Sequence, residues 1–268
     1  MQPISIKGFL AEDNGKTNFY FKDGMLWERG IDGADNLWRT SLANIAWGDP
    51  ALKDGMIKCI RWVKPNQIQY YRTTYHDDND VSRDQVTMFL VAMAIMGEDV
   101  KPYIKATKWR LSKRHKLTVD MWLWMKALGG NTVARKLFYL LEIPIIKISY
   151  FWNKSKLSRH IYPGYAAHLL AWQLYALNHT TNQSMEISST LLKIVDQDNY
   201  LVQLLLGYEV NEDKINGIKP MTDFVWQRYK SSTKSNLRPL SGKEAEYNAL
   251  DVDVLNTIYN RERCKQAD

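Results

Sequence analysis

The sequence predicts a mainly α-helical protein, a toroid or arc of alternating inner and outer helices resembling an α/α-barrel, with a small N-terminal β lead-in. Hairpin-turn signals fill residues 1–34, and from residue 35 the apolar periodicity is helical. Two stretches, 82–97 and 118–130, each begin with Ser/Thr-x-Asp, continue with apolar residues and end at glycine. Amphipathic stretches alternate with them, so the apolar helices are expected inside and the amphipathic ones outside. An irregular α-helical bundle is the alternative.

The composition is typical of a folded protein without a membrane span. The chain has 268 residues, 45% of them hydrophobic, and we expect a β lead-in over 1–34 and one helical domain over 35–268. The net charge of +7 favours anionic partners without identifying one. The two cysteines form no motif, which indicates a reducing compartment. Because the N-terminus lacks the apolar core of a signal peptide, we expect synthesis in the cytoplasm.

The lead-in is predicted from its turns. Asn14-Gly15 and Asp23-Gly24 are both dipeptides that favour tight β-hairpin turns. Between them, Phe19-Tyr20-Phe21 has the aromatic character of a strand. These signals predict hairpin structure before the first helix.

Two helices are predicted next. The first runs from Asn36 to Trp47 and ends at Gly48, and Asp49-Pro50 then begins another. We expect the second helix to continue as far as Val63, with Pro65 stopping it and a loop over 66–81. Its predicted apolar stripe consists of Leu52, Met56, Cys59, Ile60 and Val63.

The stretch from Ser82 to Gly97 predicts the central buried helix. Ser82 and Gln85 have the spacing of a capping box, and every residue from Val86 to Met96 is apolar except Thr87. A helix without a polar face is buried in protein, and this one is far shorter than the roughly 20 residues that cross a bilayer. The acidic run His76 to Asp80 lies just before it.

The remaining helices follow from the same signals. An amphipathic helix is predicted over 100–111, and an apolar one over 121–128 that ends at Gly129-Gly130. The later predicted helices cover 131–141, 163–177, 185–195, 200–206 and 249–259.

Predicted inner and outer helices alternate over residues 35–207, with acids and aromatics at the mouths of the inner ones. This pattern resembles the α/α-toroid glycan-active proteins. These include glycoside hydrolases and polysaccharide lyases, so the resemblance implies binding or degradation of an acidic glycan. The chain also resembles phage-encoded proteins, which implies a virion as one location. The alternative is a non-enzymatic structural or interaction protein, such as a virion component that binds other virion proteins.

Asp84 and Asp120 are the candidate catalytic residues. Each lies in the first turn of an apolar helix, and a toroid would bring both to one rim. Glycoside hydrolysis needs two carboxyl groups roughly 5–9.5 Å apart, one acting as acid and the other as base or nucleophile. A carboxylate in the first turn also stabilises a helix through its dipole, so a purely structural role is the alternative.

Six further residues are candidate substrate contacts. Arginine forks bind carboxylates such as those of uronic acids, and aromatic rings offer apolar faces to sugars. Packing at the rim, ion pairs with nearby acids and, for His168, a hydrogen-bonded core position are the alternatives. The six are Arg39, Arg83, Tyr71 and Arg72 near the first mouth, with Tyr162 and His168 in a second cluster.

The remaining motifs exclude several kinds of site. The acids around Asp80 begin like a calcium loop, but Arg83 and Phe89 stand where that loop needs glycine and glutamate, so no metal is predicted. The segment Lys101–Lys116 carries seven lysines and arginines. They suggest a nucleic-acid or anionic surface, although a solvated helix face is the usual explanation and nucleic acid is not the expected partner. No phosphate-binding loop or dinucleotide fingerprint is present, and no cofactor is predicted.

Overall fold

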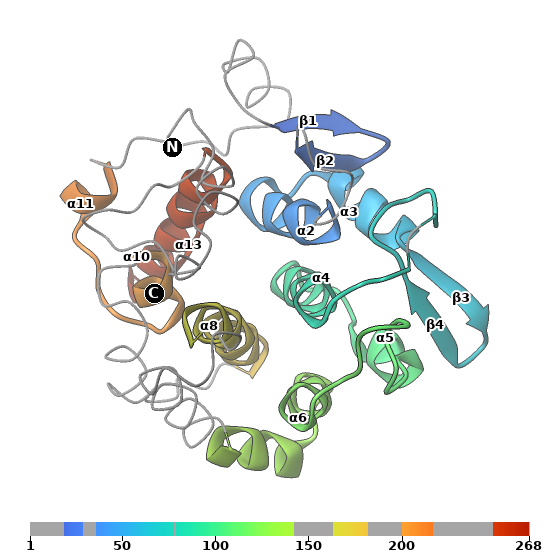
Figure 1. Ribbon diagram of the computed structural model, residues 1–268. Helices are drawn as coiled ribbons and strands as arrows, with labels where there is room; N and C mark the ends of the chain where they lie inside the picture. The colour runs from blue at the N-terminus through green and yellow to red at the C-terminus, as the bar shows by residue number, and fades with distance from the viewer. Residues whose placement is uncertain are drawn as a thin grey trace, which may run out of the picture. The chain divides into compact units, whose positions relative to one another are not determined.

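The protein is mainly helical, as predicted, and carries two small antiparallel hairpins (Figure 1). The computed structural model describes residues 19–28, 36–77, 79–141, 163–181, 200–216 and 249–267. The chain divides into two compact units, Met1–Arg135 and Lys136–Asp268, which are treated separately below.

The first hairpin confirms the Asp23-Gly24 turn. Strands β1 (Phe19–Lys22) and β2 (Met25–Glu28) pair directly across it. Asp23 and Gly24 have φ angles of 54° and 78°, the left-handed conformations that a two-residue turn matching the twist of its strands requires. The other turn signal, Asn14-Gly15, lies outside the described residues.

Helix α2 (Asn36–Trp47) covers the free edge of β2. The backbone N–H of Leu26 donates to Oγ1 of the fully buried Thr40 at 3.1 Å. Helix α2 also packs against α3 (Pro50–Lys58) and α4 (Arg83–Ile95). The predicted start of α3 is confirmed, because Asp49 Oδ1 accepts from the Ala51 N–H at 2.8 Å.

The prediction for residues 59–70 is wrong. Helix α3 ends at Lys58, and the chain continues as a second hairpin, β3 (Ile60–Lys64) and β4 (Gln67–Tyr70). Branched and aromatic residues in β3 favour a strand, and Pro65-Asn66 makes the turn. Of the predicted apolar stripe, Val63 is exposed with its neighbour Trp62, whereas the other four residues are buried although the helix ends at Lys58.

Helix α4 is buried from Gln85 to Ile95, as predicted. Gly97 terminates the helix just after Ile95. Its φ of 77° lets the Glu98 N–H donate to the Met93 carbonyl at 2.9 Å. The predicted capping box does not form. Ser82 makes no side-chain cap bond, and Gln85, the third residue of the helix, is buried.

Helix α5 (Lys101–Ala106) is shorter than predicted. Thr107 turns the backbone to an extended conformation, and its Oγ1 donates to the Tyr103 carbonyl while lying 2.7 Å from the Tyr70 hydroxyl oxygen. After a loop, α6 (Val119–Leu128) ends at Gly129-Gly130 as predicted. Asn131 then caps a helix over 132–141 by accepting from the Ala134 N–H.

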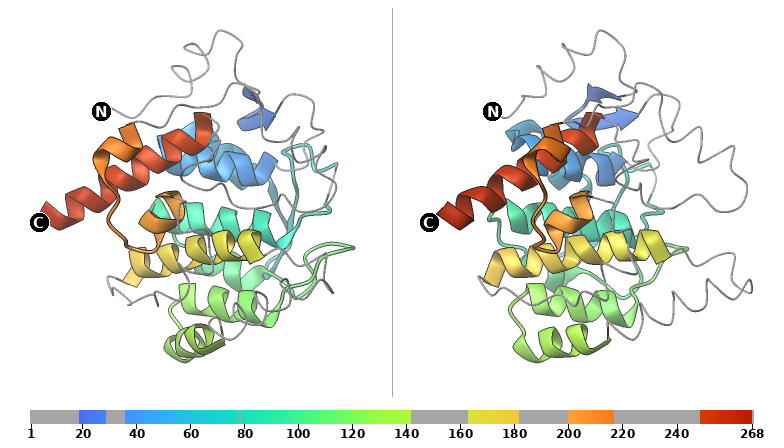
Figure 2. Two further views of the ribbon diagram at one scale, coloured as in Figure 1. Left: turned by 60° about the vertical axis from the view of Figure 1, so that its left-hand side comes forward. Right: turned by 90° about the vertical axis from the view of Figure 1, so that its left-hand side faces the viewer.

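In the second unit, the short helix α10 (Tyr200–Leu205) packs against α8 (Pro163–Thr181) and α13 (Ala249–Ala267) (Figure 2). Helix α10 is followed by Gly207 with a φ of 80°, as predicted. Helix α13 runs beyond the predicted end, and Arg263 on its polar extension pairs with Glu212 of α11 (Glu212–Asn216). The helix predicted over 185–195 lies outside the described residues.

Both cysteines are free. Cys264 is exposed, whereas Cys59 is buried with its Sγ 3.5 Å from the Met25 Sδ, and desolvation raises the pKa of its thiol. Cys59 therefore acts as a small core residue. Among the described helices, none combines the length and apolar character needed to cross a membrane.

Close backbone contact between Gly24 and Gly55 fixes the first hairpin on α3. A Cβ atom added at Gly55 would lie 1.9 Å from the Gly24 carbonyl oxygen. Gly55→Ala is therefore expected to lower the free energy of unfolding by about 1–3 kcal/mol or more, because backbone must move. Urea denaturation measures the loss.

The neighbouring exposed position supplies the control. Asp54→Ala is expected to change stability by no more than about 0.5 kcal/mol, since its ion pair with Lys58 is exposed. A Gly55→Ala protein as stable as the wild type would refute this packing.

Candidate functional site

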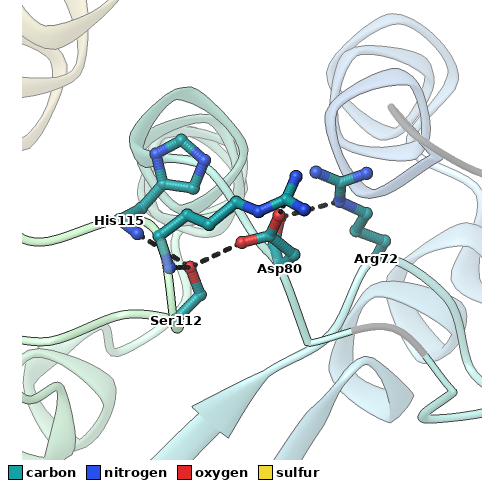
Figure 3. A network of polar contacts seen from close by, with 5 residues as sticks. Arg72, Asp80, Ser112 and His115 are labelled. Atoms are coloured by element: carbon teal, nitrogen blue, oxygen red, sulfur yellow. Dashed lines mark hydrogen bonds and ion pairs between the residues drawn. The ribbon is translucent and has the colours of Figure 1, made fainter.

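The candidate site is formed by two loops of the first unit, residues 71–82 before α4 and residues 107–117 before α6. We call the second the basic loop. Asp80 joins them (Figure 3): its Oδ1 accepts from Ser112 Oγ at 3.0 Å, and its Oδ2 pairs with Arg114 Nη1 at 3.2 Å. Its own carbonyl accepts from Arg72 Nε at 2.8 Å. The Asp80 side chain is only 20% exposed, so these partners replace most of its hydration.

The basic loop has an internally bonded structure. Arg110 and Lys116 form an isolated β-bridge, and the Leu117 N–H donates to the Trp109 carbonyl at 2.8 Å. At the tip, Ser112 Oγ accepts from the N–H groups of Arg114 and His115 at 3.3 and 3.0 Å. The Arg110 guanidinium donates to the carbonyls of Ser112 and Lys113. The loop therefore holds one conformation through its own bonds and through Asp80.

The surface of this loop and of helix α5 before it is strongly positive. Residues 100–119 contain no acid, and the seven lysines and arginines among them are all exposed. The two arginines make the contacts described above. The side chains of the five lysines in this segment form no ion pair in the described part of the chain. These lysines are Lys101, Lys105, Lys108, Lys113 and Lys116. Trp109, 49% exposed, adds an aromatic ring to the same segment.

Asp84 and Asp120 lie in the first turns of α4 and α6, as predicted, and both are partly exposed. Within the described residues neither carboxylate makes a hydrogen bond or an ion pair. Asp80 links the loop just before Asp84 to the loop just before Asp120. Asp84 and Asp120 therefore lie just after two loops that are in contact, although no hydrogen bond or ion pair joins the two carboxylates in the described residues.

Two of the predicted substrate contacts have structural partners. Arg72 holds the Asp80 backbone. Tyr71 is buried, with its ring centroid 4.4 Å from that of His76, and His76 Nε2 is 2.6 Å from the Lys58 carbonyl oxygen. The first two contacts are internal to the loop before α4, and the His76 contact joins that loop to the end of α3.

The other predicted contacts are placed differently. Arg83 is exposed at the first residue of α4. Arg39, on α2, is half-buried with its guanidinium carbon 5.6 Å from the centre of the Phe19 ring. His168 belongs to α8 of the second unit, its side chain outside the described part, and Tyr162 lies outside it altogether.

Sequence reasoning missed the linking role of Asp80, Ser112 and Arg114. Asp80 was considered only as a member of an acidic run, and the basic segment only as a source of charge. The one local signal was the polar turn Ser112 to His115, which follows the end of the apolar periodicity. Among the residues that the structure describes, no three His, Cys, Asp or Glu side chains group as metal ligands.

No protein-family model, no curated protein and no solved structure matches the chain. A functional proposal therefore depends on the residues of the site.

The bond between Asp80 and Ser112 can be measured by a double-mutant cycle. Asp80→Ala is expected to lower the free energy of unfolding by about 1.5–3 kcal/mol, because the nearly buried Ser112 hydroxyl loses a charged acceptor. Ser112→Ala should cost a similar amount. With both changes present the loss should fall short of the sum by about 0.5–3 kcal/mol in urea denaturation. Strictly additive losses would show that the two side chains do not interact.

Proposed function

We propose that the first unit binds an acidic glycan at the basic loop and the helix α5 that precedes it. The observation that carries this proposal is an exposed run of seven cations, free of acids, whose five lysines have no ion-pair partner in the described residues. A linear acidic polysaccharide would release counterions when it meets such a surface. The exposed ring of Trp109 offers an apolar face for a sugar ring beside those charges.

The fixed shape of the loop supports binding. A surface that is already ordered loses little conformational entropy when a ligand arrives, so more of the interaction energy appears as affinity. Asp80 provides that order through Ser112 and Arg114. It also places one negative charge within the cationic loop, which reduces repulsion among the loop's own side chains.

The proposal retains the expected toroid or arc. Helices α2 and α4 are almost wholly buried, whereas α3 and α5 expose lysines, which is the alternation expected of inner and outer helices. In that arrangement Asp84 and Asp120 stand at the mouths of inner helices. They are the carboxylates that would serve as acid and base if the glycan is cleaved.

Binding can be tested with heparin and polygalacturonate as acidic polysaccharides and dextran as a neutral one. Isothermal titration calorimetry should show binding to the acidic polymers only. Replacing Lys113 and Lys116 together by glutamine should weaken binding about three- to tenfold, since each exposed ionic contact contributes up to about 1 kcal/mol.

A matched variant removes two exposed lysines elsewhere, Lys136→Gln with Lys214→Gln, and should bind like the wild type. A wild-type protein that binds neither acidic polymer would contradict the proposal.

Cleavage is tested on the same polymers with Asp84→Asn, which keeps the shape of the side chain and removes its charge. As a general acid or base, Asp84 should contribute about two to four orders of magnitude to turnover. The variant should unfold within about 1 kcal/mol of the wild type, the usual value of a first-turn carboxylate. Equal turnover by wild type and variant would exclude Asp84 from the chemistry.

One observation favours the alternative of an interaction protein. The helix over 132–141 exposes Val133, Leu137 and Leu140 by 66%, 44% and 69%. Their spacing of four and then three residues forms an apolar seam of the kind that joins helices. Sedimentation equilibrium without glycan should then show self-association that Leu137→Lys abolishes, and a monomer at every concentration would count against this role.

A further inference from the structure

Arginines and lysines have different tasks in the basic loop. Arg110 donates to the carbonyls of Ser112 and Lys113, and Arg114 pairs with Asp80 while its side chain stays 81% exposed, so both guanidinium groups have partners within the site. The lysines have no such partners in the described residues. The charges of this segment that are free for a ligand are therefore mainly lysine ammonium groups.

The choice of lysine affects what can be recognised. A guanidinium is a planar fork that fits a carboxylate in a bidentate way, whereas an ammonium is a compact point charge on a flexible stem. Lysines therefore respond to the number and density of negative charges more than to the geometry of each group. Lys101 and Lys105 stand one turn apart on α5, about 6 Å along its axis, which suits closely spaced anionic groups.

We propose that the ligand of the basic loop is a sulfated polysaccharide, recognised by the lysines of residues 101–116 through its charge density and by Trp109 through a sugar ring. This inference rests on the proposed glycan binding and narrows it to polymers that carry sulfate esters. Trp109 is suited to the second role because its backbone is fixed by the bond to Leu117 while its ring remains half-exposed.

Three polysaccharides form a series in which sulfate content and charge density fall together: heparin with several sulfates per disaccharide, chondroitin sulfate with about one, and hyaluronate with carboxylates only. A thymidine oligonucleotide serves as a polyanion without sugar-ring faces of this kind. Dissociation constants are measured for each from 50 to 300 mM NaCl. Affinity should fall in the order heparin, chondroitin sulfate, hyaluronate, and the oligonucleotide should bind more weakly than heparin.

Three variants test the residues. Lys101→Gln with Lys105→Gln should weaken heparin binding about tenfold at low salt and flatten the dependence of log Kd on log salt by roughly one to two. Lys101→Arg with Lys105→Arg keeps the charge and should restore both. Trp109→Ala should weaken binding about two- to tenfold without altering the salt dependence. Trp122→Ala, at an exposed tryptophan of α6, is its control and should change nothing.

The outcomes separate this inference from the function on which it rests. Equal affinity for hyaluronate and heparin would refute recognition of charge density while leaving glycan binding intact. If Lys101→Arg with Lys105→Arg binds heparin as weakly as the double glutamine variant, positive charge is not what these positions supply. Tighter binding of the oligonucleotide than of heparin, lost in Trp109→Ala, would identify a nucleic-acid surface instead. Failure to bind any of the three polysaccharides would overturn the proposed function itself.

Discussion

The first unit depends on the burial of α4, a helix with no polar face. Water must be excluded from every side of it, since each large apolar side chain contributes roughly 1.5–3 kcal/mol when buried. Helix α2 packs along α4 and in turn covers the open edge of β2 through Thr40. The Gly24–Gly55 contact then fastens that hairpin to α3. The position of each element in this series therefore depends on its packing against the element named before it.

Once α4 is fixed, the loop that leads into it becomes a fixed surface as well. Tyr71 and Arg72 make contacts within this loop, His76 joins it to the Lys58 carbonyl, and Asp80 projects from it into the basic loop. A single carboxylate thus connects the loop that leads into the buried helix α4 to the basic loop. Acidic residues just before a helix suggest a catalytic or metal-binding role. Asp80 instead stabilises the basic loop through Ser112 and Arg114.

Features that depend on nearby residues were predictable from the sequence. The Asp23-Gly24 turn, the Asp49 cap, the glycine stops and the burial of α4 each follow from chemistry within a turn or two of the chain. The errors fall where distant residues decide. Helix α5 ends at Thr107, which bonds to a tyrosine 37 residues away, and Asp80 meets Ser112 across 32 residues. The β3–β4 hairpin was missed because its apolar residues also fit a helical period by chance.

The contrast between features set by nearby residues and features set by distant residues also applies to the candidate site. Seven cations are visible in the sequence, but only the structure separates the arginines that hold the loop from the lysines that remain open. A rigid backbone bearing flexible lysines can meet a polymer whose charges are unevenly spaced, because each ammonium adjusts while the loop does not. Fixed arginine forks would demand a regular ligand. Under the proposed function, the loop would suit a heterogeneous polyanion better than one defined carboxylate. Asp84 and Asp120 stand in the first turns that follow the two joined loops.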